Sequence, residues 1–268
     1  NVMPFASATT SSDLIARRFA ALRERDGKAL VVYITAGHPD RPRSLALLRG
    51  VAEAGADVIE IGVPFSDPLA DGPVIQASSQ RALEQGMTFD GALELVREAA
   101  VDVPLVLFSY LNPIVAAGPD AFSRAAAAGI SGLLVTDLPV GGDPELEAHI
   151  GESPLAFIRL VAPTTPTPRM AEIARHGSGF VYLISRLGVT GMRDEIAGDL
   201  ADTIARLRSA TKLPVCVGFG ISGPEQAAAV AGMADGVVVG SAVVRAAETS
   251  VDAAVTLVRS LRTAIDER

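Results

Sequence analysis

Residues 57–73, DVIEIGVPFSDPLADGP, decide how the rest of the chain is interpreted. The apolar, β-branched residues at the start of this stretch predict a buried strand, and the prolines and glycines that follow predict an ordered loop. Because side chains alternate along a strand, Glu60 shares one face with Val58 and Gly62, so helices packed on the opposite face would leave its carboxyl pointing inward. A second acid, Asp71, lies near the end of the loop. An inward carboxylate is costly to bury, which indicates a functional role for Glu60.

Seven further short apolar runs accompany this strand along the chain, and helical patterns separate them. The predicted strands are ALVVYITA (29–36), DVIEIG (57–62), PLVLFSY (104–110), SGLLVTD (131–137), LAFIRLVA (155–162), GFVYLIS (179–185), PVCVGFG (214–220) and DGVVVG (235–240). An additional helix is predicted over residues 11–25, before the first strand. Eight strands that alternate with helices predict an α/β fold, a single parallel (β/α)8 TIM barrel over residues 11–268, with residues 1–10 as a flexible N-terminal tail.

The competing architecture is an open, doubly wound parallel sheet. Such a sheet commonly carries a glycine-rich dinucleotide-binding fingerprint after its first strand, whereas this chain continues there as ITAGHPD. The barrel is therefore favoured.

The composition excludes several classes of partner. The chain of 268 residues has a formal net charge of −8 and no basic run, which argues against nucleic acid or an anionic membrane as its main partner. It has no apolar stretch long enough to predict a membrane span. Its one cysteine, Cys216, lies in a buried-looking strand and cannot form an internal disulfide, so a reducing cytoplasm is the simplest location.

Two glycine-rich turns follow the seventh and eighth predicted strands, GFGIS (218–222) and VGSA (239–242). Their glycines, among them Gly220 and Gly240, allow backbone amides to face outward, and Ser241 is placed to cap the last helix and to bind an anion. In such barrels phosphate commonly binds after these two strands. Either turn alone is compatible with an ordinary tight turn, but the pair predicts a phosphate site.

The connection after the sixth strand, LGVTGMRDEIAGDL (187–200), contains three glycines and few apolar residues. Its length and composition favour a mobile lid over the barrel mouth, with an ordinary strand-to-helix connection as the alternative.

The positions of the lysines and histidines reduce the number of possible reaction mechanisms. A Schiff-base aldolase needs a lysine in the barrel mouth, but Lys28 and Lys212 each precede a strand and are expected at the opposite end. The three histidines are scattered, which does not predict a metal cluster. General acid–base catalysis by Glu60 and Asp71 remains. The alternatives are a structural carboxylate satisfied by backbone amides for Glu60 and a turn-stabilising residue for Asp71.

Four sequence motifs together indicate a specific protein family. VIEIGVPFSDPLADGPVIQ (58–76), FVYLISRLGVTG (180–191), GFGIS and VGSA resemble the α subunit of tryptophan synthase in their order and spacing. The resemblance covers most of the predicted barrel. It implies a (β/α)8 barrel with an extra N-terminal helix. It also implies a lyase of tryptophan biosynthesis that cleaves indole-3-glycerol phosphate to indole and glyceraldehyde 3-phosphate.

The resemblance also implies roles for individual residues. Glu60 matches the catalytic acid/base, and Asp71 matches the carboxylate that faces the indole nitrogen. Further matches are Tyr182, Thr190 and Phe219 for substrate binding, Gly191, Gly220, Gly240 and Ser241 for phosphate binding, and Asp67 for signalling to a partner subunit. Tyr110, at the end of the third strand, is added to the substrate-binding set. One departure is LPVGGD (138–143), where many members carry acids; it puts the capping of the next helix in doubt.

The implied partner is a β subunit, in an αββα heterotetramer that passes indole between sites. Pyridoxal phosphate is expected only on that β subunit, and no cofactor is expected in this chain. Three rival interpretations stay open at this point. They are a stand-alone indole-3-glycerol phosphate lyase, another phosphate-binding barrel with a different substrate, and a non-catalytic allosteric binder of a β subunit.

Overall fold

Eight parallel strands close into a barrel in the order β1 to β8. The structure is a computed structural model and describes residues 11–185, 194–218 and 220–268. The strands are β1 (Ala29–Thr35), β2 (Val58–Gly62), β3 (Leu105–Ser109), β4 (Ile130–Val135), β5 (Ala156–Val161), β6 (Val181–Ile184), β7 (Val215–Gly218) and β8 (Gly236–Val239). Each begins within two residues of its predicted start. The predicted barrel is confirmed.

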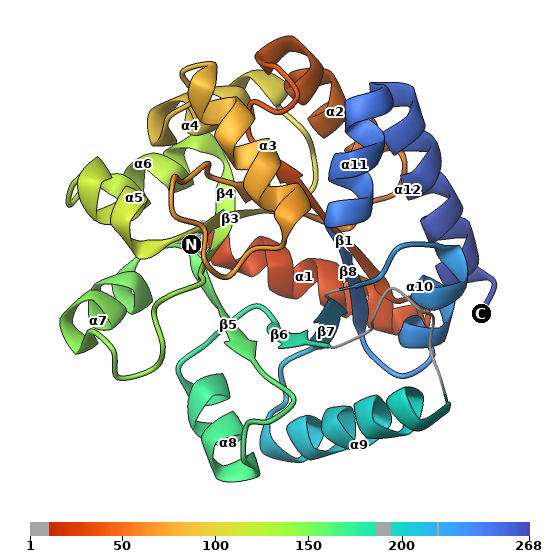
Figure 1. The fold of residues 1–268 in the computed structure, drawn as a ribbon. Coiled ribbons are helices and arrows are strands. Elements are labelled where there is room, and N and C mark those ends of the chain that lie inside the picture. The colour runs from red at the N-terminus through yellow and green to blue at the C-terminus, as the bar shows by residue number, and fades with distance from the viewer. Residues whose placement is uncertain (1–10, 186–193, 219) are drawn as a thin grey trace, which may run out of the picture.

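Helices surround this barrel (Figure 1). They are α1 (Ser11–Glu24), α2 (Arg41–Glu53), α3 (Pro73–Glu84), α4 (Phe89–Ala99), α5 (Leu111–Ala117), α6 (Ala121–Ala128), α7 (Pro144–Glu152), α8 (Thr167–Arg175), α9 (Asp194–Ala210), α10 (Pro224–Ala231), α11 (Ser241–Thr249) and α12 (Val251–Asp266). None of the described helices is long and apolar enough to cross a membrane.

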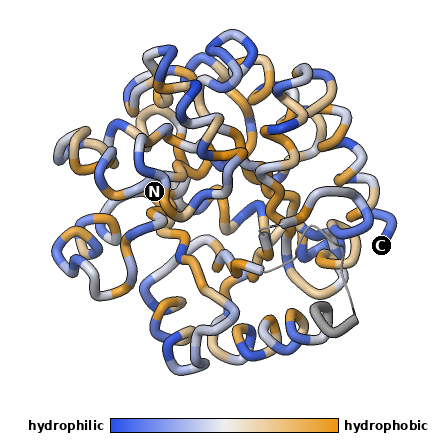
Figure 2. The backbone as a smooth tube through the Cα atoms, in the orientation of Figure 1, coloured by the Kyte–Doolittle hydropathy of each residue, from blue (hydrophilic) through white to orange (hydrophobic). Residues whose placement is uncertain are grey.

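The apolar core has two separate parts. One lies between the strands and the outer helices, and the other fills the barrel interior; Figure 2 shows hydrophobic residues concentrated around the strands. The helix α1 closes the interior at the N-terminal end of the barrel, because Ile15, Phe19 and Leu22 belong to the interior cluster. The rings of Phe19 and Phe180 have centroids 5.6 Å apart. This end is therefore packed, and the mouth at the opposite end is free for a site.

Several helices differ from the sequence prediction. The helix α9 begins at Asp194, inside the expected lid (187–200), so the second half of that lid is helical. Gly198 suggested a loop there, but one glycine inside a helix costs only about 1 kcal/mol. The helices α3 and α5 were not predicted. The last helix was expected near Ser241, yet two helices follow, and Ser250 caps the second by accepting a hydrogen bond from the Ala253 amide at 3.0 Å.

The expected N-terminal tail, residues 1–10, and the first part of the expected lid, residues 187–193, lie outside the described residues.

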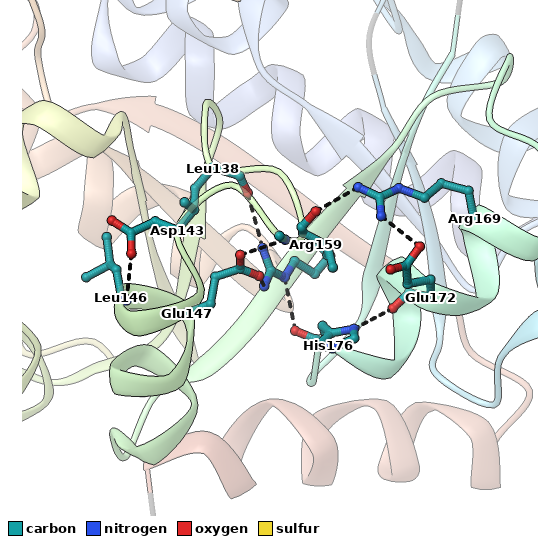
Figure 3. Close-up of polar contacts among 10 residues, drawn as sticks. Leu138, Asp143, Leu146, Glu147, Arg159, Arg169, Glu172 and His176 are labelled. Atoms are coloured by element: carbon teal, nitrogen blue, oxygen red, sulfur yellow. Dashed lines mark hydrogen bonds and ion pairs between the residues drawn. The ribbon is translucent and has the colours of Figure 1, made fainter.

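A buried arginine joins the helices α7 and α8 to the barrel (Figure 3). Arg159 on β5 is 4% exposed and forms an ion pair with Glu147 on α7 at 2.5 Å. It also donates hydrogen bonds to the carbonyls of Leu138 at 3.1 Å and His176 at 3.0 Å. Its guanidinium stacks 3.7 Å from the ring centroid of Phe157. One side chain therefore connects β5 with α7, with the loop before α7 and with the C-terminal end of α8.

The departure LPVGGD (138–143) does not leave the following helix without a cap. Asp143 is the N-cap of α7, and its carboxylate accepts a hydrogen bond from the Leu146 amide at 3.0 Å. Pro144 follows at the first helical position, where proline is favoured.

Candidate active site

Glu60 points into the barrel, as strand alternation predicted. Val58 belongs to the interior cluster, whereas Ile59 and Ile61 pack against the helices outside. The Glu60 side chain is 1% exposed, and its Oε1 has no hydrogen-bond partner among the residues that the structure describes. Burial raises the pKa of Glu60 to about 8. A carboxyl with this pKa holds its proton at neutral pH and can donate it.

Asp71 lies on the loop that follows β2, and its neighbours hold it in place. Burial raises the pKa of Asp71 to about 6, although a hydrogen bond from the Tyr110 side chain acts in the opposite direction. The Tyr110 hydroxyl also accepts a hydrogen bond from the Ala70 amide at 2.9 Å. Gln76 donates to the Asp71 carbonyl at 2.8 Å. Asp71 is thus a partly buried carboxylate, and the side chains of Tyr110 and Gln76 hold its loop in place.

Aromatic side chains surround the two carboxyl groups. Tyr182 on β6 is buried in the interior cluster, and burial together with the charge of Glu60 raises its pKa. Any side chain at Gly218 would collide with the Tyr182 hydroxyl, which explains the glycine there. Tyr33 and Phe108 meet edge to face, with centroids 5.2 Å apart. These rings give the mouth flat apolar walls suited to an aromatic ligand.

The two predicted phosphate turns lie at the same end of the barrel, after β7 and β8. Gly220 is exposed and has a φ of +83°, a conformation that favours glycine. Gly240 is the N-cap of α11, and Ser241 is the first residue of that helix. The prediction that Ser241 caps the helix is therefore wrong, because Gly240 occupies the cap position and supplies no side chain. Ser241 is exposed at the helix N-terminus, where free backbone amides favour anions.

The remaining predicted residues divide into two groups. Thr190, Gly191 and Phe219 lie outside the described residues. Asp67 is exposed on the loop after β2, where its carboxylate accepts a hydrogen bond from the Ser66 hydroxyl at 2.5 Å. Two residues further on, Leu69 is 92% exposed.

The two lysines lie where the sequence argument expected them. Lys28 precedes β1 and Lys212 precedes β7, at the end of the barrel opposite the two carboxyl groups. In the part of the chain that the structure describes, no group of three His, Cys, Asp or Glu side chains is placed to hold a metal ion.

Comparison with known proteins identifies the family. The family described as "Tryptophan synthase alpha chain" matches residues 19–267. The chain belongs to the tryptophan synthase alpha chain family. Among its relatives is the tryptophan synthase alpha chain of Gluconacetobacter diazotrophicus, which is 53% identical over 243 residues and 89% of each chain. That of a Caulobacter species (strain K31) is 49% identical over 87% of this chain and 86% of its own.

Solved structures of tryptophan synthase share the fold. Subunit alpha from Legionella pneumophila str. Paris is similar with a TM-score of 0.88 and 34% identity, over 97% of this chain and 100% of its own. A tryptophan synthase from M. tuberculosis, in an open form with BRD0059 bound, has a TM-score of 0.86 and 34% identity, over 94% of this chain and 98% of its own. As a tryptophan synthase alpha chain, the protein is a carbon–carbon lyase of tryptophan biosynthesis that cleaves indole-3-glycerol phosphate.

Sequence reasoning assigned no role to two side chains of the barrel mouth. Gln76 was part of a quoted motif, but its amide bond to the loop backbone depends on where α3 begins. Tyr33 stands opposite Glu60 in the register of β1 and β2. Strand alternation could have indicated that Tyr33 faces inward, since Val31 two residues earlier does the same.

Proposed function

We propose that Glu60 and Asp71 together perform the cleavage of indole-3-glycerol phosphate. The bond to be broken joins indole C3 to C1 of the glycerol chain, and it breaks only when the ring can accept the bonding electrons. Glu60 donates its proton to C3, and Asp71 holds or takes up the N1 proton, so the ring becomes an indolenine. The Glu60 carboxylate then removes the proton of the C1 hydroxyl. The carbonyl forms, the C–C electron pair returns to the ring, N1 recovers its proton from Asp71, and Glu60 is protonated again.

The observation that carries this proposal is the environment of Glu60. Its carboxyl is 1% exposed, has a free Oε1 among the described residues, and has a pKa of about 8. Asp71, with a pKa of about 6, is mostly ionised at neutral pH. Two carboxyl groups whose environments separate their pKa values are suited to opposite proton-transfer roles.

The substrate phosphate is proposed to bind at the other side of the mouth. The N-terminus of α11, with Gly240 and Ser241, and the turn at Gly220 support this assignment, because free amides and the helix dipole favour an anion there. Gly191 is assigned to the same phosphate site on the resemblance alone. Tyr182, Thr190 and Phe219 are assigned to the indole ring and its chain in the same way.

We further propose that the chain acts with a β subunit in an αββα heterotetramer in the cytoplasm. Support comes from the similarity to a solved structure of tryptophan synthase from M. tuberculosis. The exposed Asp67 and Leu69 place a polar and an apolar group on the surface of the loop that carries Asp71. Pyridoxal phosphate is assigned to the β subunit, and this chain is assigned no cofactor.

The test of the catalytic assignment compares the wild-type chain with Glu60→Gln. Indole released from indole-3-glycerol phosphate is separated and quantified, and binding of indole-3-propanol phosphate, an uncleavable analogue, is measured by calorimetry. The variant should lose activity by a factor on the order of 10³ or more, since it can neither donate nor accept the proton, and should bind the analogue about as well as wild type. Retained turnover in the variant would refute the role of Glu60.

A further inference from the structure

Tyr33 lies between the two halves of the proposed site. Its strand, β1, pairs with β8 on one side and with β2 on the other. The strand β8 leads into the phosphate turn at Gly240, and β2 carries Glu60, which is the register partner of Tyr33. Any group that joins a phosphate at Gly240 to a reacting atom at Glu60 must pass Tyr33.

The side chain of Tyr33 extends from the phosphate turn at Gly240 to the strand that carries Glu60. A Cβ atom at Gly240 would lie 3.4 Å from the Cβ of Tyr33. At the other end of the side chain, the hydroxyl lies against Gly62, where any side chain would collide with it. Burial raises the pKa of Tyr33, and the charges of Asp71 and Glu60 raise it further, so the phenol stays protonated.

The hydroxyl of Tyr33 receives a hydrogen bond but gives none within the described part of the chain. Thr35 Oγ1 donates to it over a long 3.4 Å, and Thr35 Oγ1 lies 2.7 Å from Ser78 Oγ. Since each hydroxyl has one proton, Ser78 donates to Thr35 in this arrangement and leaves the Thr35 proton for Tyr33. This chain of hydroxyls orients the Tyr33 oxygen as an acceptor and leaves its proton directed elsewhere. A buried phenol with an unused donor is suited to a polar atom of a ligand.

We propose that the Tyr33 hydroxyl donates a hydrogen bond to a hydroxyl of the glycerol chain of the substrate and thereby selects a hydroxylated chain between ring and phosphate. This inference rests on the proposed function. The glycerol chain joins the indole C3 to the phosphate and carries hydroxyls at C1 and C2, so its length lies along Tyr33. Tyr33 is a binding residue in this assignment, and Glu60 remains the group that moves protons.

A purely structural role is the alternative, because the Tyr33 ring also packs against Phe108. Tyr33→Phe separates the two roles, since it removes only the hydroxyl and keeps the ring. The variant is compared with wild type in two assays. One is the cleavage of indole-3-glycerol phosphate, and the other is the binding of indole-3-propanol phosphate, which keeps the ring, the three-carbon chain and the phosphate but lacks both chain hydroxyls.

The expected result is that kcat/KM for indole-3-glycerol phosphate falls about five- to tenfold, as for one lost neutral hydrogen bond, while the Kd of the analogue changes less than twofold. An equal loss for both compounds would show a packing role, and no loss for either would show an unused hydroxyl; both overturn the inference. A wild-type chain that releases no indole would refute the proposed function instead, so the two failures are distinguishable.

Discussion

At the scale of the single residue, the two carboxyl groups predict a bell-shaped pH dependence. The active form has Asp71 ionised and Glu60 protonated. Because burial places their pKa values at about 6 and about 8, kcat/KM should rise as pH increases through about 6 and fall above about 8. A pH–rate profile of indole release measures both limbs. A rate that stays constant up to pH 10 would remove Glu60 as the proton donor.

Tyr110 should control the acidic limb of that profile. Its hydrogen bond to the Asp71 side chain favours the ionised carboxylate and so lowers the Asp71 pKa. Tyr110→Phe should therefore move the acidic limb to higher pH and leave the basic limb, which belongs to Glu60, in place. Tyr33→Phe is the matched control, because Tyr33 has no hydrogen bond to Asp71 among the described contacts. An unchanged acidic limb in Tyr110→Phe would contradict the assignment of that limb to Asp71.

The buried Glu60 carboxyl should also lower the free energy of unfolding as pH rises. Its folded pKa of about 8 lies above the model-peptide value of 4.5, so the folded chain keeps a proton that the unfolded chain releases. Stability linked to this proton is fully present below pH 4.5 and is lost as pH rises through 8. Glutamine does not titrate, so the stability of Glu60→Gln relative to wild type should increase by roughly 3 kcal/mol between pH 5 and pH 8. Urea unfolding at both pH values measures it, with the exposed Glu53→Gln as a control.

At the scale of the element, the connection between α7 and α8 depends on one buried ion pair. Arg159→Met removes the partner of Glu147 and leaves two carbonyls, of Leu138 and His176, without their donor. Breaking a buried pair from one side costs about 3 kcal/mol, so urea unfolding should show a loss of this size. The double variant Arg159→Met/Glu147→Leu should lose less than the sum of the two single variants.

The control for this prediction is an ion pair within α8. Arg169 and Glu172 form an ion pair at 2.7 Å, but both side chains are more than one third exposed. Arg169→Met should cost less than about 1 kcal/mol, because water screens exposed pairs. An equal loss for Arg159 and Arg169 would show that burial does not set the strength of the Arg159 contact.

Elements also show where sequence reasoning succeeded. The alternation of Val58, Glu60 and Gly62 was enough to place the Glu60 carboxyl inside the barrel, because a strand has only two faces. The same reasoning does not provide the register between strands, and so it did not bring Tyr33 opposite Glu60. The start of α9 was missed because Gly198 outweighed the helical residues around it. Long-range partners such as Arg159 and His176 depend on the packing of three elements and have no local signal in the sequence.

At the scale of the whole molecule, the two ends of the barrel have different tasks. At the N-terminal end, Asp57 accepts hydrogen bonds from the Leu30 amide at 2.9 Å and from Arg262 on α12 at 2.8 Å, which ties the last helix to the first two strands. The carboxyl groups and the phosphate turns lie at the C-terminal end. This separation lets the mouth hold a costly buried carboxyl while the opposite end stabilises the fold.

The division between the ends predicts how the chain responds to its proposed partner. A β subunit that docks at the mouth contacts the loop that carries Asp67 and Asp71, so it should change turnover without changing the fold. Indole release by the chain alone should be slow, and a β subunit with serine should raise it by about tenfold or more, since docking orders the groups that surround the substrate. Asp67→Asn should reduce this stimulation to a greater degree than it reduces the basal rate. Fast turnover without any partner would instead identify a stand-alone indole-3-glycerol phosphate lyase.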